Sequence, residues 1–368
     1  MKSIVNKHLK IEQKRELLNT REYYLLRSVL GYGNWAMFFF LLGGREAGKS
    51  YQVTKFYTAQ WFIYKRPFYW LRLTEESKRK LLKNNAEKLI DPDIRRAFSI
   101  ETTTIGDNVY VVTKRSKPDK NGKTKILEKE LLCRVMALST FYNDKGSGLF
   151  DNEFLNNPLM YYNICLDEMN REANERNSFD IVYAFVNQIE NLIRSTKKRV
   201  RIICIGNTLE EASDLLCAFN FIPEKFGRFK IKKKRAVIEY IEPSEAYLNR
   251  RKGTVADILL PNSSTFTNKI KTDNTLVYKG RRRRPTGIIM FGKEDDHKFT
   301  IWDGNIICKY KNEKIKPVIA MRPYMDEVYV PEAVKTVFQS FDFRGYKYKD
   351  LITFKLFQKE LALLKPSR

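Results

Sequence analysis

One eight-residue segment constrains the fold of this chain more than any other. Residues 43–50 read GGREAGKS and match the pattern G-x-x-x-x-G-K-[ST]. The apolar run 37–42 precedes the segment, and helix-compatible residues follow it to about Tyr64, which is the context that the pattern requires. Glycines let the chain turn tightly, so that backbone N–H groups and a helix N-terminus face an anion. We therefore predict a phosphate-binding loop between a buried strand and a helix.

The last two residues of this segment carry the expected chemistry. Lys49 is predicted to reach the β- and γ-phosphates of ATP, and the hydroxyl of Ser50 is predicted to bind Mg²⁺. ATP and Mg²⁺ are thus the expected cofactors. The backbone of the whole segment should contact the nucleotide, which makes the candidate binding residues Gly43, Gly44, Arg45, Glu46, Ala47, Gly48, Lys49 and Ser50.

A second pattern is an apolar run that ends in two adjacent carboxylates, ICLDE at 164–168. Neighbouring side chains at a strand end point in different directions. Asp167 is therefore expected to join the Mg²⁺ shell while Glu168 faces an attacking water. A catalytic Glu here is typical of ATPases rather than GTPases or kinases, and the sequence contains no N-K-x-D motif for guanine recognition. Together with the loop, this pair indicates ATP hydrolysis.

Two further positions are candidates for contact with the γ-phosphate. The basic segment 194–199 lies between an amphipathic helical pattern, 181–193, and an apolar run, 200–205. Arg194 is the expected arginine finger, reaching the nucleotide of a neighbouring subunit; the alternative is a solvated helix end. Asn207 follows the apolar run and is expected to sense the γ-phosphate or orient water, with a turn-forming Asn as the alternative.

The alternation of apolar strands and helical stretches predicts an α/β fold with a mostly parallel sheet covered on both faces. Asn121–Gly122, between two β-rich runs, predicts a hairpin turn inserted in this domain. We expect an ATPase domain over 1–248, a linker or lid over 249–276, and an α+β domain over 277–368. In that last domain, short strands are followed by helical segments at 331–340 and 347–364.

The charge of the chain indicates a polyanionic partner. Lys and Arg number 68 against 43 Asp and Glu, a formal net charge of +25, which favours nucleic acid over a membrane surface. The clusters suit contact with a phosphate backbone without reading of bases, although such runs are often merely solvated. Lys145, in a glycine-rich loop, is a candidate for the inner face of a ring. The candidate DNA-binding residues are Lys145, Lys232, Lys233, Lys234, Arg281, Arg282, Arg283 and Arg284.

Several classes of protein are excluded. No apolar run reaches the roughly 18 residues of a membrane span, and the first residues have no apolar signal region, so we expect a soluble protein. The five cysteines show no C-x-x-C spacing and are expected to be reduced core residues. With only two histidines, His8 and His297, a catalytic triad or a histidine-based metal cluster is not expected.

With these residues identified, the sequence resembles the genome-packaging ATPases of small short-tailed phages with protein-primed genomes, which are relatives of large terminase subunits. GGREAGKS resembles their Walker A motif, ICLDEMNRE their Walker B motif, and IRSTKKRVRIICIGN their arginine-finger helix and following strand. The resemblance implies a homopentameric ring on the portal of a procapsid, in the host cytoplasm, that moves double-stranded DNA. It also implies an RNase H-like C-terminal domain without nuclease activity that binds nucleic acid or the portal. Lys145 matches by position a loop lysine that links DNA and nucleotide between subunits, and a packaging RNA is a further candidate partner.

Two departures and two alternatives accompany this resemblance. The segment after Arg194 is one residue longer than the family pattern, so Lys197, Lys198 and Arg199 stay alternative fingers. The run GIIMFG carries no carboxylate and 294–296 are predicted to lie in a turn, which favours a degenerate nuclease. The alternatives are another oligomeric P-loop ATPase acting on nucleic acid, helicase-like or for assembly, and a DNA-binding scaffold without activity.

Overall fold

The computed structural model divides the chain into two compact units. Unit 1 comprises Met1–Glu210 and Pro223–Ile270, and unit 2 comprises Glu211–Ile222 and Lys271–Arg368. The short segment 211–222 thus joins the second unit, which a division at residue 248 does not anticipate. The residues that the structure describes are 22–118, 124–144, 161–170, 179–193, 199–207, 213–259, 261, 276–292, 294–315, 318–320, 343 and 345–364.

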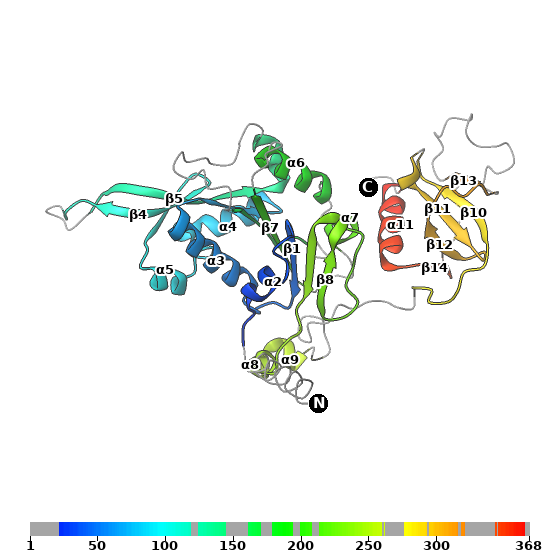
Figure 1. Ribbon diagram of the computed structural model, residues 1–368, viewed down its shortest axis with the longest axis horizontal. Coiled ribbons are helices and arrows are strands. Elements are labelled where there is room, and N and C mark those ends of the chain that lie inside the picture. Colours follow the sequence, from blue (N-terminus) through cyan, green and yellow to red (C-terminus); the bar gives the residue numbers. More distant parts are fainter. Residues whose placement is uncertain are drawn as a thin grey trace, which may run out of the picture. The chain divides into compact units, whose positions relative to one another are not determined.

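Unit 1 is built on a nine-stranded sheet with the order β3-β4-β5-β2-β6-β7-β1-β9-β8 (Figure 1). The six strands from β5 to β9 in this order are parallel to one another. β3 and β4, which form a meander with β5 at one edge, and β8 at the other edge are antiparallel additions. The strands are β1 (Phe38–Gly43), β2 (Phe68–Arg72), β3 (Thr102–Ile105), β4 (Asn108–Arg115), β5 (Ile126–Ala137), β6 (Tyr161–Asp167), β7 (Arg199–Asn207), β8 (Gly227–Ile231) and β9 (Ala236–Tyr240). The predicted α/β fold with a mostly parallel sheet is confirmed.

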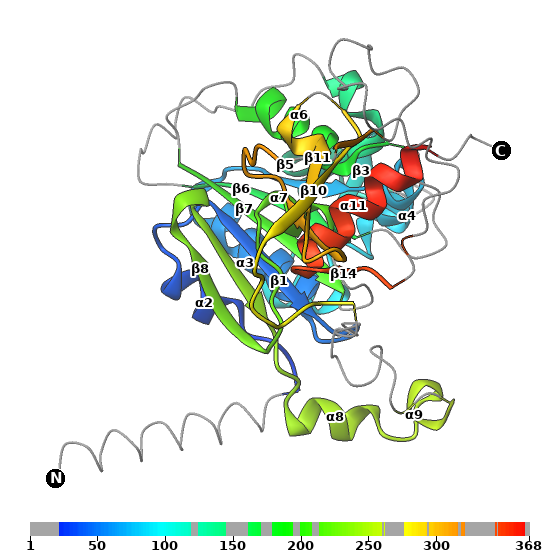
Figure 2. The same ribbon diagram turned by 90° about the vertical axis from the view of Figure 1, so that its right-hand side faces the viewer.

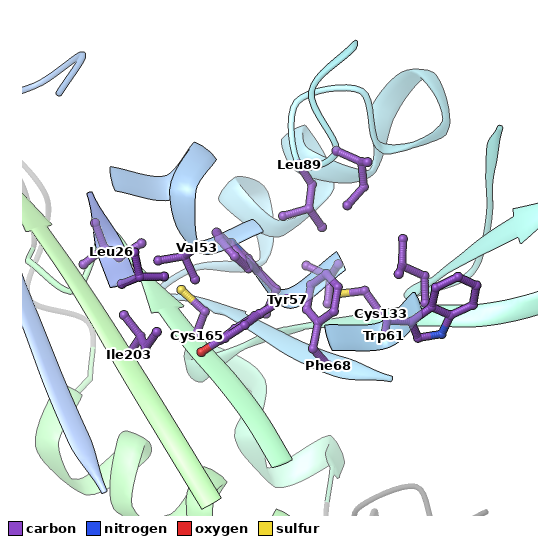
Figure 3. Packing of buried hydrophobic residues seen from close by; sticks show 14 of the residues in the cluster. Leu26, Val53, Tyr57, Trp61, Phe68, Leu89, Cys133, Cys165 and Ile203 are labelled. Carbon is purple, nitrogen blue, oxygen red and sulfur yellow. The ribbon is translucent and has the colours of Figure 1, made fainter. Parts of the chain in front are cut away.

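Helices cover both faces of the parallel strands. On one face, α3 buries Val53, Tyr57 and Trp61 against the strands, together with residues of α2 and α4 (Figure 3). On the other face, Phe185 of α6 contacts Phe38 of β1, with ring centroids 6.5 Å apart. Two covered faces explain why the central strands carry long apolar runs, such as FFFLL in β1 and IICI in β7, instead of a regular alternation of polar and apolar residues. The helices of unit 1 are α2 (Leu26–Tyr32), α3 (Lys49–Tyr64), α4 (Glu75–Ala86), α5 (Pro92–Phe98), α6 (Ile181–Ile193), α8 (Glu245–Arg251) and α9 (Val255–Leu259), with the 3₁₀ segments η1 (Leu138–Asp144) and η3 (Lys232–Lys234).

The predicted hairpin corresponds to β4 and β5, which pair in antiparallel fashion. Its predicted turn, Asn121–Gly122, lies outside the described residues. All five cysteines are free and buried, as expected for reduced core residues. In the part of the chain that the structure describes, none of the helices has the length and apolar character needed to cross a membrane.

Unit 2 contains a five-stranded mixed sheet with the order β13-β10-β11-β12-β14. β10, β11 and β12 form an antiparallel meander, while β13 is parallel to β10 and β14 is parallel to β12. The long helix α11 packs on β12 and β14 (Figures 1 and 2), and Phe357 contacts Phe291 and Phe299 in the core. The elements are β10 (Pro285–Met290), β11 (Lys298–Trp302), β12 (Ile306–Lys309), β13 (Val318–Ala320), β14 (Lys347–Tyr348), α7 (Asp214–Ala218), α11 (Leu351–Leu364) and η4 (Asp295–His297). The predicted helix at 331–340 lies outside the described residues.

Candidate functional site

The predicted nucleotide-site residues meet at one edge of the sheet in unit 1. Gly43, at the end of β1, is aligned with Asn207, at the end of β7, and Asp167 ends the next strand, β6. Parallel strands bring their carboxyl ends to the same edge, where ligands of α/β proteins bind. A cavity of about 410 Å³ opens there, lined by Arg45, Glu46, Ala47, Gly48, Lys49, Ser50, Tyr51, Asp167, Glu168, Ile205 and Asn207.

The phosphate loop, residues 43–50, turns at two residues with positive φ. Glu46 and Gly48 both have left-handed backbones, with φ of 62° and 79°. Alternation of right- and left-handed residues turns successive N–H groups into one concave surface for an anion. A side chain at Gly48 would also be strained by its φ and would approach Tyr23 to 3.1 Å, so glycine is needed at this position. Helix α3 begins directly afterwards, at Lys49.

Lys49 is buried and folds back onto the loop. Its Nζ donates to the carbonyl oxygens of Gly43 at 2.8 Å and Gly44 at 2.6 Å, and to Asn207 Oδ1 at 3.4 Å. Burial lowers the pKa of Lys49 to about 8, and the nearby negative charge of Asp167 opposes this shift. The ammonium therefore lacks a full counter-charge, which an anionic phosphate in the cavity would supply.

Ser50 and Asp167 place two hard oxygen atoms side by side. The Ser50 hydroxyl donates to Asp167 Oδ1 at 3.0 Å, across the gap between the start of α3 and the end of β6. Among the described residues there is no cluster of three or more His, Cys, Asp or Glu that would bind a metal without help. Two adjacent oxygen ligands fit Mg²⁺, which usually takes few protein oxygens and completes its shell with water and substrate phosphate.

Arg72 is a site residue that sequence reasoning missed. Its Nη1 lies 3.1 Å from Asp167 Oδ2 and 2.9 Å from Glu168 Oε2, so one guanidinium bridges the two adjacent carboxylates. The side chain of Arg72 is 10% exposed, whereas that of Glu168 is 54% exposed and sits on a left-handed backbone, with φ of 57°. Arg72 ends β2, which pairs with β6. The sequence feature that could have indicated Arg72 is its position as the single charged residue, at the end of the otherwise uncharged strand FYWLR.

The side chains of Asp167 and Glu168 were expected to point in different directions, but both contact Arg72. Asp167 faces Ser50 with one oxygen and Arg72 with the other, and Glu168 faces the same guanidinium. Their predicted roles in metal binding and water activation stay predictions. Arg194 and Lys145, the candidate finger and the candidate loop lysine, lie outside the described residues.

The basic clusters lie in different settings. Lys232, Lys233 and Lys234 form η3, an exposed turn between β8 and β9 at the edge of the sheet opposite the phosphate loop. Arg281–Arg284 lead into β10 in unit 2, and this run is less bare than expected. Asp303 accepts hydrogen bonds from the backbone N–H groups of residues 283 and 284, and the Arg282 guanidinium stacks on the Trp302 ring at 5.2 Å.

Comparison with known proteins finds the same fold in phage packaging motors. No family model and no curated protein matches the sequence. The Phi-28 gp11 DNA packaging motor superposes with a TM-score of 0.61 at 17% identity, covering 94% of this chain and 99% of that one. The bacteriophage Phi-29 genome packaging motor assembly gives a TM-score of 0.60 at 17% identity, covering 94% and 100%. The predicted resemblance is thus confirmed at the level of fold.

Proposed function

We propose that this chain is an ATPase motor that moves viral double-stranded DNA into a procapsid, working as a homo-oligomeric ring. The observation that carries the proposal is the convergence of the phosphate loop, Asp167, Glu168 and Asn207 on one cavity. The fold shared with two phage packaging motors over 94% of this chain adds support. A helicase-like or assembly ATPase remains the second candidate, because it would use the same cavity.

In this proposal the N–H groups of the loop and the ammonium of Lys49 bind the phosphates of ATP. Ser50 and Asp167 would hold Mg²⁺, which when bound neutralises charge between the β- and γ-phosphates. Glu168 would accept a proton from the attacking water. Because Arg72 now pairs with Glu168, that ion pair has to break or shift before the carboxylate acts as a base. Asn207, within 3.4 Å of Lys49, would contact the γ-phosphate.

The oligomeric part of the proposal assigns Arg194 as a finger acting on the neighbouring subunit. Each active site would then be built from two chains, and a pentamer is the expected ring. An Arg194→Ala chain should bind ATP almost normally and lose hydrolysis. Mixed with Glu168→Gln chains, it should recover part of the ATPase activity, since some interfaces combine an intact Glu168 with an intact Arg194. If rings shown by native mass spectrometry to be mixed stay inactive, suspicion moves to Lys197, Lys198 or Arg199.

DNA, the portal and a packaging RNA are the proposed partners, and the net charge of +25 supports the two nucleic acids. Lys145, Lys232–Lys234 and Arg281–Arg284 are the proposed contacts with the phosphate backbone. The whole complex would assemble in the host cytoplasm, attached to a procapsid while DNA enters.

For unit 2 we propose an RNase H-like fold that has lost nuclease activity. No carboxylate lies in β10, and Asp295 in the turn η4 pairs with Lys298 at 2.9 Å. Two-metal nucleases need several carboxylates on adjoining elements. The intact chain should therefore not cut DNA in Mg²⁺ or Mn²⁺. Metal-dependent cutting that Asp295→Asn or Asp296→Asn removes would contradict this proposal.

Steady-state ATP hydrolysis by the full chain, with and without duplex DNA, tests the central proposal. A motor should hydrolyse ATP faster on duplex DNA and package DNA into procapsids that carry their portal. A helicase-like enzyme should prefer single strands and separate them, and an assembly ATPase should respond to its protein partner. A scaffold without activity should hydrolyse nothing.

A further inference from the structure

Three hydrogen-bond donors hold the backbone carbonyl groups on the outer side of the phosphate loop. Tyr247 Oη donates to the carbonyl oxygen of Arg45 at 2.8 Å, and Arg250 Nη2 donates to that of Glu46 at 2.8 Å. The backbone N–H of Tyr24 donates to the carbonyl oxygen of Ala47 at 3.0 Å. Three successive peptide units of the loop are thus held, two of them by side chains of α8.

These contacts fix the direction of the loop's N–H groups. In a planar trans peptide the N–H points opposite to the C=O. Holding the carbonyls of residues 45, 46 and 47 from outside therefore turns the N–H groups of residues 46, 47 and 48 away from the donors. Glu46 and Gly48 have left-handed backbones, and a left-handed non-glycine residue such as Glu46 persists only where its surroundings hold it.

The donors on α8 are themselves held in place. Tyr247 is buried, and its hydroxyl accepts a hydrogen bond from Arg251 Nη1 at 2.7 Å while donating to Arg45. The hydroxyl therefore links a cation to the loop carbonyl, and such a charged donor strengthens the next hydrogen bond in a chain. Arg250 stacks over the ring of Tyr23 at 4.4 Å. The buried residues of α8 are Tyr247 and Arg251, the two residues that form this chain of hydrogen bonds to the loop.

We propose that Tyr247 and Arg250 are positioning residues for nucleotide binding. They hold the outer side of the phosphate loop so that its N–H groups stay aimed at the phosphates, without touching the nucleotide themselves. The inference rests on the proposed ATP-binding function and extends it to a helix about 200 residues away from the loop in sequence.

The kinetic signature follows from where these contacts act. A loop that keeps its shape binds the phosphates in the ground state and in the transition state alike. Loosening it should raise KM and leave kcat nearly unchanged. A group acting on Glu168 or on the attacking water would instead lower kcat.

The test is titration of the full chain with Mg·ADP and Mg·ATP, followed by steady-state kinetics. Tyr247→Phe keeps the ring and removes the hydroxyl with both of its hydrogen bonds, to the loop and from Arg251. Loss of the bond to the loop should lower nucleotide affinity by about five- to tenfold. Arg250→Ala should weaken affinity by a similar factor and Arg250→Lys should restore part of it, with kcat within about twofold of wild type throughout. Tyr161→Phe is the matched control, because it removes a tyrosine bond to a backbone carbonyl, that of Asn34, away from the site.

Thermal unfolding separates positioning from general stability. ADP should raise the unfolding midpoint of Tyr247→Phe by less than it raises that of the wild-type chain. This loss of stabilisation by ADP should be larger than the drop in midpoint that Tyr247→Phe shows without nucleotide. Unchanged affinity in Tyr247→Phe and Arg250→Ala, with affinity lost in Lys49→Ala, would overturn the inference and leave the proposed function intact. Absence of nucleotide binding by the wild-type chain would overturn the proposed function, and the inference with it.

Discussion

Lysines at the two ends of the sheet in unit 1 share a formal charge and little else. At the carboxyl end, Lys49 is buried, donates to two backbone carbonyls and has a pKa lowered to about 8. At the opposite end, Lys232 and Lys233 are exposed in η3, and no ion pair joins them to a carboxylate among the described residues. A buried ammonium suits one anion at a fixed place, whereas exposed ammonium groups attract any polyanion that approaches. The net charge of +25 therefore includes both buried ammonium groups, such as Lys49, and exposed ones, such as Lys232.

A single substitution at the carboxyl end of the sheet should therefore remove nearly all of the ATPase activity. Glu168→Gln should lower ATP turnover by roughly 10³-fold, because the base is removed, and leave nucleotide binding intact, because the loop and Asp167 remain. Single-turnover hydrolysis and ADP titration measure the two effects. Turnover equal to wild type would show that Glu168 is not the base.

Lys49→Ala should have the next largest effect. Loss of the ammonium removes a charge-assisted contact with the phosphates, and we expect affinity for ATP to fall by about 100-fold, with packaging abolished. The same substitution at Lys232 should leave ATP affinity unchanged, which makes it the matched control. Equal effects at both lysines would contradict the distinction between the two ends.

At the opposite end, DNA affinity should fall gradually, in proportion to the number of lysines that are replaced. Changing Lys232, Lys233 and Lys234 together to Ala should weaken binding of duplex DNA by about tenfold at low salt. The slope of log affinity against log salt should become shallower by about two to three, with no change in sequence preference. Fluorescence anisotropy at several salt concentrations measures this, and an unchanged slope would remove η3 from the DNA contacts.

The smallest expected effect is a pH dependence of nucleotide binding. With a pKa of about 8, Lys49 is mostly charged at pH 7 and loses its proton as the pH rises through 8, so ATP affinity should decline by several-fold between pH 7.5 and 9. Folding stability should change with the opposite sign. Because the unfolded chain binds this proton more tightly than the folded chain, the contribution of Lys49 to stability is least favourable below pH 8 and improves up to about 10.5. In Lys49→Arg, nucleotide titrations from pH 6.5 to 9.5 should be flat.

The sequence predicted the parallel sheet and most of the residues that line the cavity at its carboxyl end, because both depend on local patterns. The loop at 43–50, the strand ending at Asp167 and the strand ending at Asn207 each carry their signal within about ten residues. Parallel strands must end at a common edge, so recognising them is sufficient to bring these residues together. The edge strand β8 was not predicted, because the basic run at 225–235, interleaved with Phe and Ile, has no clear period, and its neighbour β9 directly follows that run.

By itself, the sequence determined what is written in contiguous residues: the phosphate loop, the pair of carboxylates, the alternation of strands and helices, and the excess of positive charge. Only the tertiary structure decided which strands are neighbours and which distant side chains reach the site. Arg72 bridges Asp167 and Glu168 because β2 lies beside β6, and Tyr247 reaches Arg45 from the helix that follows β9. Such contacts depend on packing between segments about 100 to 200 residues apart, and no local propensity or period records them.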